Sequence, residues 1–82
     1  MNTLSRLQRI LEYNMSWSLE SSKLGLWETK TSLGLDKLDW INLIILIEED
    51  FRIEVPEYIY SDFRNMKDIV SYIDGELTER GF

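Results

Sequence analysis

The sequence predicts an all-α fold, a four-helix bundle formed by residues 1–82 as a single domain. Apolar residues recur at spacings of three and four in separate segments, which is typical of helices that bury one face. No segment alternates apolar and polar residues as a half-buried strand does. A chain of this length buries only about 60% of the surface that its unfolded form exposes, so the core is small.

The first helix is predicted over residues 3–17. Its apolar stripe consists of Leu4, Leu7, Ile10, Leu11 and Met15. Either Thr3 or Ser5 is expected to cap its start, because an N-cap hydroxyl accepts a hydrogen bond from a free backbone N–H.

Residues 18–35 interrupt this periodicity and predict a long loop between the first two helices. Serine, threonine and glycine accumulate there around isolated apolar residues, which are Leu24, Leu26, Trp27 and Leu33. A connection of this length without helix or strand is unusual in a compact domain. We therefore expect the apolar side chains to hold the loop on the core, with Trp27 as an anchor.

The second helix is predicted to begin after Asp36 and to end before the turn at 52–56. Asp36 followed by Asp39 is typical of a capping box, and Pro56 disfavours helical geometry at Val55. Between these limits lie more apolar residues than one buried stripe requires: Leu38, Ile41, Leu43, Ile44, Ile45, Leu46, Ile47 and Phe51. A four-helix domain cannot bury all of them.

The third helix is predicted to be short, with one or two turns in residues 57–63. The fourth begins after Asn65, a second expected cap with Asp68 three residues on, and frays toward Gly81. Its apolar stripe is Met66, Ile69, Val70, Ile73 and Leu77. The core is predicted to contain Leu7, Leu11, Leu43, Ile47, Phe51, Ile69 and Ile73.

The composition excludes most catalytic chemistry. The chain has no cysteine and no histidine, which removes disulfides, thiolate nucleophiles, the usual zinc sites and imidazole acid/base catalysis. We expect no metal site, since the acidic stretch 48–57 lacks the central glycine of a calcium loop. Carboxylates that act as general acid and base need a cleft and shifted pKa values, so we expect no enzymatic activity.

The net charge of −6 is unevenly distributed. Residues 1–35 carry four basic and three acidic side chains, a charge of +1, whereas residues 36–82 carry five basic and twelve acidic ones, a charge of −7. An acidic half repels phosphate backbones, so we expect no nucleic-acid binding. The longest apolar run, residues 43–47, is far too short to span a membrane, and we expect a cytoplasmic protein without membrane insertion.

The centre of the chain carries a recognisable pattern. It reads Leu33-Gly34-Leu35-Asp36-Lys37-Leu38-Asp39, and the second helix closes with Glu48-Glu49-Asp50-Phe51 before Val55-Pro56. This pattern resembles acyl carrier proteins, whose members show Leu-Gly-x-Asp-Ser-Leu-Asp, an apolar helix closed by acids and a phenylalanine, and an x-Ile-Pro turn. Residues 65–73 are similar to the start of the family's last helix. The resemblance implies the four-helix carrier fold.

Lys37 departs from that pattern. In the family, the serine between aspartate and leucine receives 4'-phosphopantetheine through a phosphodiester, and the thiol of this arm carries acyl groups. A lysine between Asp36 and Leu38 has no hydroxyl for this bond, and Ser32 lies outside the motif. We therefore expect no phosphopantetheine cofactor. Either a natural relative has lost the group, which we favour, or the lysine replaces a native serine.

The acidic second helix is the expected partner-binding surface. An exposed patch is predicted from Leu38, Trp40, Ile41 and Ile45, framed by the acids Asp39, Glu48 and Glu49. The resemblance implies a partner with a basic surface, such as a synthase or an acyltransferase. Two alternatives stay open: the loop at 18–35 covers the patch, with Trp27 over the gap, and the acids are an ordinary solvated charge run.

Three functions follow from these observations. The leading one is a non-enzymatic acyl-carrier-like protein that binds another protein and has lost its carrier function at Lys37. The second is a true carrier of fatty-acid, polyketide or peptide synthesis, seen as a serine-to-lysine variant. The third is a small immunity, inhibitor or adaptor protein with only fold-level similarity.

Overall fold

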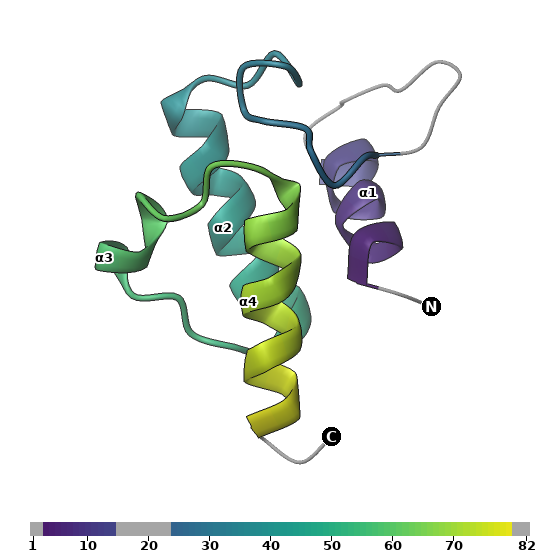
Figure 1. Ribbon diagram of the computed structural model, residues 1–82. Helices are drawn as coiled ribbons and strands as arrows, with labels where there is room; N and C mark the ends of the chain where they lie inside the picture. Colours follow the sequence, from purple (N-terminus) through teal and green to yellow (C-terminus); the bar gives the residue numbers. More distant parts are fainter. Residues whose placement is uncertain (1–2, 15–23, 80–82) are drawn as a thin grey trace.

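The computed structural model describes residues 3–14 and 24–79, and this part of the chain contains four helices and no strand. The helices are α1 (Thr3–Asn14), α2 (Lys37–Phe51), α3 (Glu57–Tyr60) and α4 (Met66–Glu79) (Figure 1). α1 packs against both α2 and α4. The predicted all-α class and the short third helix are confirmed.

The predicted start of the first helix is wrong in its detail. Thr3 and Ser5 both lie within α1, so neither is the residue that precedes it. The Thr3 hydroxyl instead donates a hydrogen bond to the Asp74 carboxylate on α4. The end predicted for this helix, residues 15–17, and the fraying predicted near Gly81 lie outside the described residues.

The loop that leads into α2 is attached to two helices. The Leu24 N–H donates to the Gln8 side-chain oxygen of α1 at 2.9 Å. At the start of α4, the Met66 N–H donates to the Glu28 carbonyl at 2.9 Å, and the Lys67 N–H donates to the Leu26 carbonyl at 2.7 Å. The loop therefore accepts hydrogen bonds from N–H groups that a helix start leaves without intrahelical partners.

Leucine side chains, rather than the tryptophan, hold this loop on the core. Leu24 and Leu33 are buried, as predicted. The prediction that Trp27 is an anchor is wrong, because its side chain is 69% exposed and the Lys67 ammonium lies over its ring at 5.0 Å from the centroid. A cation–π contact with a lysine stabilises a tryptophan ring that lies at the surface.

The two predicted caps are present. The Asp39 N–H donates to the Asp36 carboxylate at 2.8 Å, and the Asp36 N–H donates to the Asp39 carboxylate at 3.1 Å, which completes the capping box of α2. At α4, the Asp68 N–H donates to the Asn65 side-chain oxygen at 3.0 Å. Local sequence therefore fixes where both helices begin.

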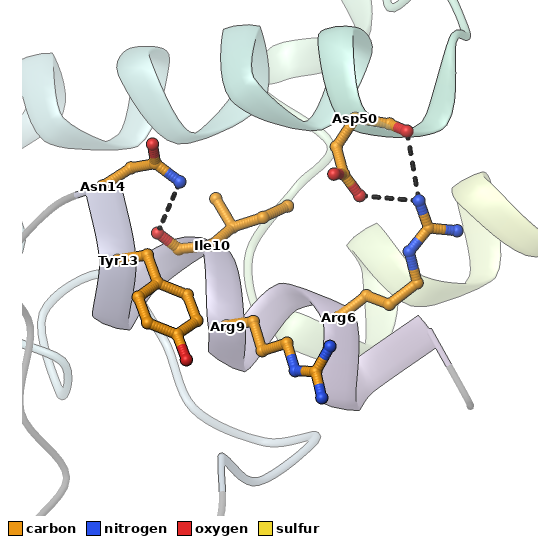
Figure 2. A pocket seen from close by; sticks show the side chains of 6 residues that line it. All are labelled: Arg6, Arg9, Ile10, Tyr13, Asn14 and Asp50. Atoms are coloured by element: carbon orange, nitrogen blue, oxygen red, sulfur yellow. Dashed lines mark hydrogen bonds and ion pairs between the residues drawn. The ribbon is translucent and has the colours of Figure 1, made fainter.

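The C-terminal end of α2 is closed by a cation from α1. The Arg6 guanidinium donates to the Asp50 carboxylate at 2.7 Å and to the Asp50 carbonyl at 3.1 Å (Figure 2). The same guanidinium lies 4.0 Å from the centroid of the Phe51 ring. A cation also interacts favourably with the negative end of the helix dipole, which lies at this C-terminus, whereas the local acids interact unfavourably with it.

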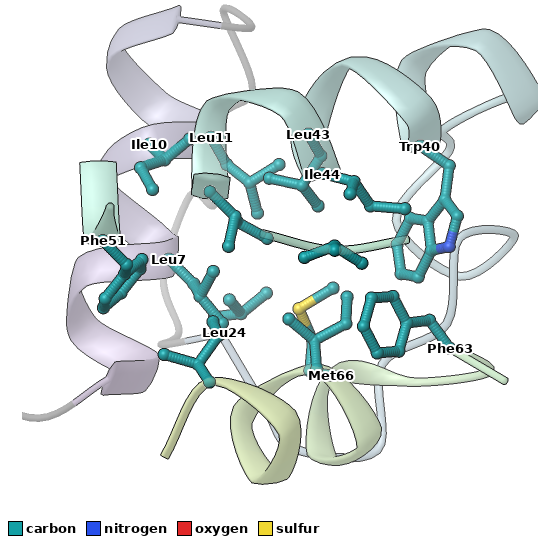
Figure 3. Packing of buried hydrophobic residues seen from close by; sticks show 14 of the residues in the cluster. Leu7, Ile10, Leu11, Leu24, Trp40, Leu43, Ile44, Phe51, Phe63 and Met66 are labelled. Atoms are coloured by element: carbon teal, nitrogen blue, oxygen red, sulfur yellow. The ribbon is translucent and has the colours of Figure 1, made fainter. Parts of the chain in front are cut away.

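One apolar cluster joins α1, α2, α4 and the loops (Figure 3). Its fully buried members include Leu7, Leu11, Leu43, Ile47, Met66, Ile69 and Ile73. Every residue predicted for the core is buried, Phe51 included. Among the described residues, no helix is both long enough and apolar enough to cross a membrane.

Candidate binding surface on α2

The start of α2 follows a hydrogen-bonded turn and is exposed to solvent. The preceding turn is closed by the Leu35 N–H, which donates to the Lys30 carbonyl at 2.8 Å, and by Gly34, whose φ of +74° suits glycine. Within the capping box, between Asp36 and Asp39, Lys37 and Leu38 are the first two residues of the helix, and both are exposed. The Leu38 side chain is 68% exposed.

Lys37 places an amine at this helix start. The group faces the positive end of the helix dipole, where a cation is unfavourable, and it offers no hydroxyl for a phosphodiester. The nearby Ser32 hydroxyl is part of the preceding turn. It donates to the Glu28 carboxylate at 2.8 Å and accepts a hydrogen bond from the Thr29 N–H at 2.8 Å.

The predicted exposed patch is partly present. Leu38 and Ile45 are exposed, the latter by 43%, and Ile41 is half-buried. The loop does not cover them with Trp27, which is itself exposed. Leu38, Ile41 and Ile45 therefore form an apolar stripe along the solvent side of α2.

Trp40 does not belong to that stripe, and its predicted exposure is wrong. The side chain is only 6% exposed and lies beside Phe63 at one end of the core (Figure 3). The reason is helical spacing, because Trp40 precedes Leu43 by three residues and Ile44 by four and so shares their buried face.

The acids that close α2 are not equivalent. The Glu48 carboxylate accepts a hydrogen bond from the Val55 N–H at 3.0 Å, and the Glu48 carbonyl accepts one from the Ile53 N–H at 3.2 Å. Asp50 is paired with Arg6. Glu49 is exposed and lines a hollow beside Leu46. Glu48 therefore stabilises the turn after α2, whereas Glu49 is open to a partner.

A second hollow lies beside Trp40. It measures about 320 Å³ and is lined by Thr29, Lys30, Thr31, Trp40, Tyr60, Ser61, Phe63 and Arg64. Burial raises the pKa of the Tyr60 phenol above its ordinary value, and the carboxylates of Glu48 and Glu57 raise it further. Both effects disfavour the ionised form of the phenol.

Sequence analysis missed Arg6. The acids at the end of α2 favour a compensating cation, and four basic residues of the first 34 were equally available to supply it: Arg6, Arg9, Lys23 and Lys30. Only the tertiary structure selects one of them. In the described part of the chain, no three acidic side chains gather closely enough to hold a metal ion.

The fold and this site describe a small helical domain with a capped, solvent-exposed start to its second helix. No family model matches the chain. It is 36% identical over 76 residues to the acyl carrier protein of Trieres chinensis, with 92% of each chain covered. It is 37% identical over 68 residues to that of Phytoplasma mali, covering 83% of this chain and 80% of the relative.

A solved structure agrees with these relatives. The crystal structure of an acyl carrier protein from Thermotoga maritima matches with a TM-score of 0.82 and 25% identity, covering 92% of this chain and 86% of the other. The chain belongs to the acyl carrier protein family. Members of this family are carriers rather than enzymes, they normally bear 4'-phosphopantetheine, and they interact with synthases and other enzymes. Because the similarity extends to sequence, the alternative of fold-level likeness alone is wrong.

Proposed function

We propose that this protein is a non-enzymatic member of the acyl carrier protein family that acts by binding another protein and carries no 4'-phosphopantetheine. One observation carries the proposal. Lys37 directly follows the capping residue Asp36, at the position where the motif resemblance places the members' modified serine. A phosphodiester to the arm requires an oxygen nucleophile, and the lysine side chain supplies only nitrogen.

Ser32 is not a substitute for that serine. Its hydroxyl lies five residues before Lys37 in a separate turn, where it bonds Glu28 and Thr29. Moving the oxygen to the transferase would break both hydrogen bonds. The proposal therefore contains no attachment site elsewhere in this loop.

The binding surface proposed is the solvent side of α2. Leu38, Ile41 and Ile45 supply its apolar stripe, and Asp39 and Glu49 supply its negative charge. A chain with a net charge of −6 favours a partner with a basic surface, such as a synthase or an acyltransferase. Because Glu49 is exposed and Asp39 is partly exposed, binding should weaken as the salt concentration rises.

The test is an attempt to attach the arm. The purified protein is incubated with a broad-specificity phosphopantetheinyl transferase and coenzyme A, and its intact mass is measured. We expect no change in mass for the unaltered chain and for Ser32→Ala. A gain of one phosphopantetheine by the unaltered chain would refute the proposal, and loss of that gain in Ser32→Ala would place the arm on Ser32.

The second candidate is a working carrier whose serine has been replaced by Lys37. The identity to named acyl carrier proteins over most of the chain favours it. Under this candidate, Lys37→Ser gains the arm in the same assay and is then loaded with an acyl group by carrier-dependent enzymes. Under the leading proposal, the natural gene encodes lysine at codon 37, which sequencing of the source decides.

A further inference from the structure

A furrow runs between α1 and α2, formed by three adjoining hollows. The first measures about 360 Å³ and is lined by Asn14, Asp39, Asn42, Ile45 and Leu46. The second measures about 280 Å³ and is lined by Ile10, Asn14, Leu46, Glu49 and Asp50. The third measures about 290 Å³ and is lined by Arg6, Arg9, Ile10, Tyr13, Asn14 and Asp50 (Figure 2).

Shared residues make these hollows continuous. Asn14 lines all three, Leu46 joins the first to the second, and Ile10 and Asp50 join the second to the third. Along α2 the furrow extends from Asp39 to Asp50, which at 1.5 Å per residue is about 16 Å. This length equals about three turns of a helix.

The chemistry changes along the furrow. Its floor is apolar, with Ile10 buried, Leu46 half-buried and Ile45 exposed. Its α2 wall carries the unpaired negative charges, because Asp39 and Glu49 form no ion pair with any described residue. At the far end, the Asp50 carboxylate is already neutralised by Arg6, which leaves the exposed Arg9 beside Tyr13.

We propose that this furrow binds one amphipathic helix of a partner protein, with apolar side chains on the floor, basic side chains opposite Asp39 and Glu49, and an acidic side chain opposite Arg9. This inference rests on the proposed function in protein binding. It differs from docking on the Leu38 stripe alone, because α1 supplies half of the site and the Leu38 side chain lies outside it.

Two features select a helix over other shapes. The furrow lies between two helices, so a third helix packs along it by the same ridges and grooves that build a bundle. Four of the six α2 residues that line it, at positions 39, 42, 46 and 49, recur at helical spacing. A partner helix with anchors at i, i+3 or i+4, and i+7 has a matching repeat.

The probe is a synthetic, terminally blocked peptide of about 14 residues, long enough to cover three turns. Leucines form one stripe, with lysines beside them in one half and glutamates in the other. The control peptide has the same composition with the leucines dispersed around the helix. Amide chemical shifts of the full-length 15N-labelled protein are followed during titration with each peptide.

We expect the striped peptide, and not the control, to shift the signals of Ile10, Asn14, Asn42 and Leu46. Glu49→Lys should raise the Kd of the striped peptide by on the order of tenfold. Asp62→Lys makes the same charge change outside the furrow and should leave this Kd unaltered. Ile45→Ser should weaken binding more than Leu38→Ser. Thermal melts of each variant confirm that the fold is intact.

Three results would overturn the furrow. They are shifts confined to other faces, equal weakening by Glu49→Lys and Asp62→Lys, and no binding of the striped peptide at millimolar concentration. If the same signals shifted with protein concentration in the absence of peptide, the furrow would bind a second copy of this chain, which would refute a partner helix as its occupant. If Leu38→Ser alone abolished peptide binding, the furrow would be refuted but the proposed function in protein binding would not. Attachment of phosphopantetheine to the unaltered chain would refute the proposed function, whatever the result for the furrow.

Discussion

Both ends of α2 carry acidic side chains, with Asp36 and Asp39 at the start and Glu48 to Asp50 at the finish. At the start, the two carboxylates bond the backbone of the helix itself, and Lys37 and Leu38 between them point to solvent. At the finish, Glu48 bonds the next turn, and Arg6 of α1 binds Asp50 and covers Phe51.

The two ends of α2 show that similar acids can have different roles: those at the start cap the helix, whereas Glu48 and Asp50 at the finish bind other parts of the chain. The hydrogen bonds given for the start of α2 are local, and Lys37 and Leu38 remain exposed and available to a partner. The finish is fixed by tertiary contacts, so most of its side chains are already committed. We infer that substitutions of Glu48 and Phe51 at the finish change stability most, whereas substitutions of the exposed Lys37 and Leu38 at the start mainly change modification and binding.

The largest expected difference between the ends comes from two apolar residues. Phe51→Ala should lower the free energy of unfolding by about 3–5 kcal/mol, because a buried ring and its contact with Arg6 are lost. Leu38→Ala should change it by less than about 0.5 kcal/mol, since the side chain is mostly exposed. Urea unfolding measures both, and Phe51→Leu replaces Phe51→Ala should that variant not fold. Similar losses at the two positions would remove the distinction between the ends.

The acids at the finish provide a sharper pair. Glu48→Ala should cost about 1–3 kcal/mol, because the Val55 N–H loses its acceptor beside the core. Glu49→Ala should cost less than about 0.5 kcal/mol, since this carboxylate is exposed. The urea unfolding midpoints of the two variants measure this difference. An equal effect of the two substitutions would show that the hydrogen bond to Val55 does not stabilise the turn.

Sequence alone predicted the elements whose causes are local. The three-and-four spacing placed α2 and α4 and the core leucines and isoleucines, and the Asp36 and Asn65 caps fixed where helices begin. It did not predict the partner of Asp50 or of Glu48, because a side chain's tertiary neighbour has no signature in the spacing. The same holds for Trp27, whose exposed ring is in contact with Lys67 of α4.

Trp40 shows a different kind of failure. Its position three and four residues before Leu43 and Ile44 was available from the sequence and assigns it to the buried face. The excess of apolar residues on α2 hid that periodicity, because several stripes fit nearly as well. The exposed stripe of Leu38, Ile41 and Ile45 became distinguishable only once the neighbours of Trp40 were known.

At the start of α2, the cap sets the next expected effect. Asp36→Ala should lower the free energy of unfolding by about 1 kcal/mol, because the Asp39 N–H loses its acceptor. Asp36→Ser, which preserves a capping oxygen, should retain most of the stability. Thermal unfolding of the two variants provides the comparison. A loss of the same size in Asp36→Ser would mean that the cap is not the cause.

The smallest expected effect has the opposite sign. Lys37→Ser should raise the free energy of unfolding by about 0.3–1 kcal/mol, because it removes a cation from the positive end of the helix dipole. The gain should shrink at high salt, since the group is exposed. Urea unfolding at two salt concentrations measures it. Destabilisation would indicate that Lys37 makes a favourable contact.

The central claim is that the start of α2 serves binding and bears no prosthetic group. Its most direct test is the intact mass of the protein purified with its partners from the native source. The account predicts the mass of the unmodified chain, together with a partner that co-purifies at low salt and dissociates at high salt. A mass increased by one phosphopantetheine would contradict it.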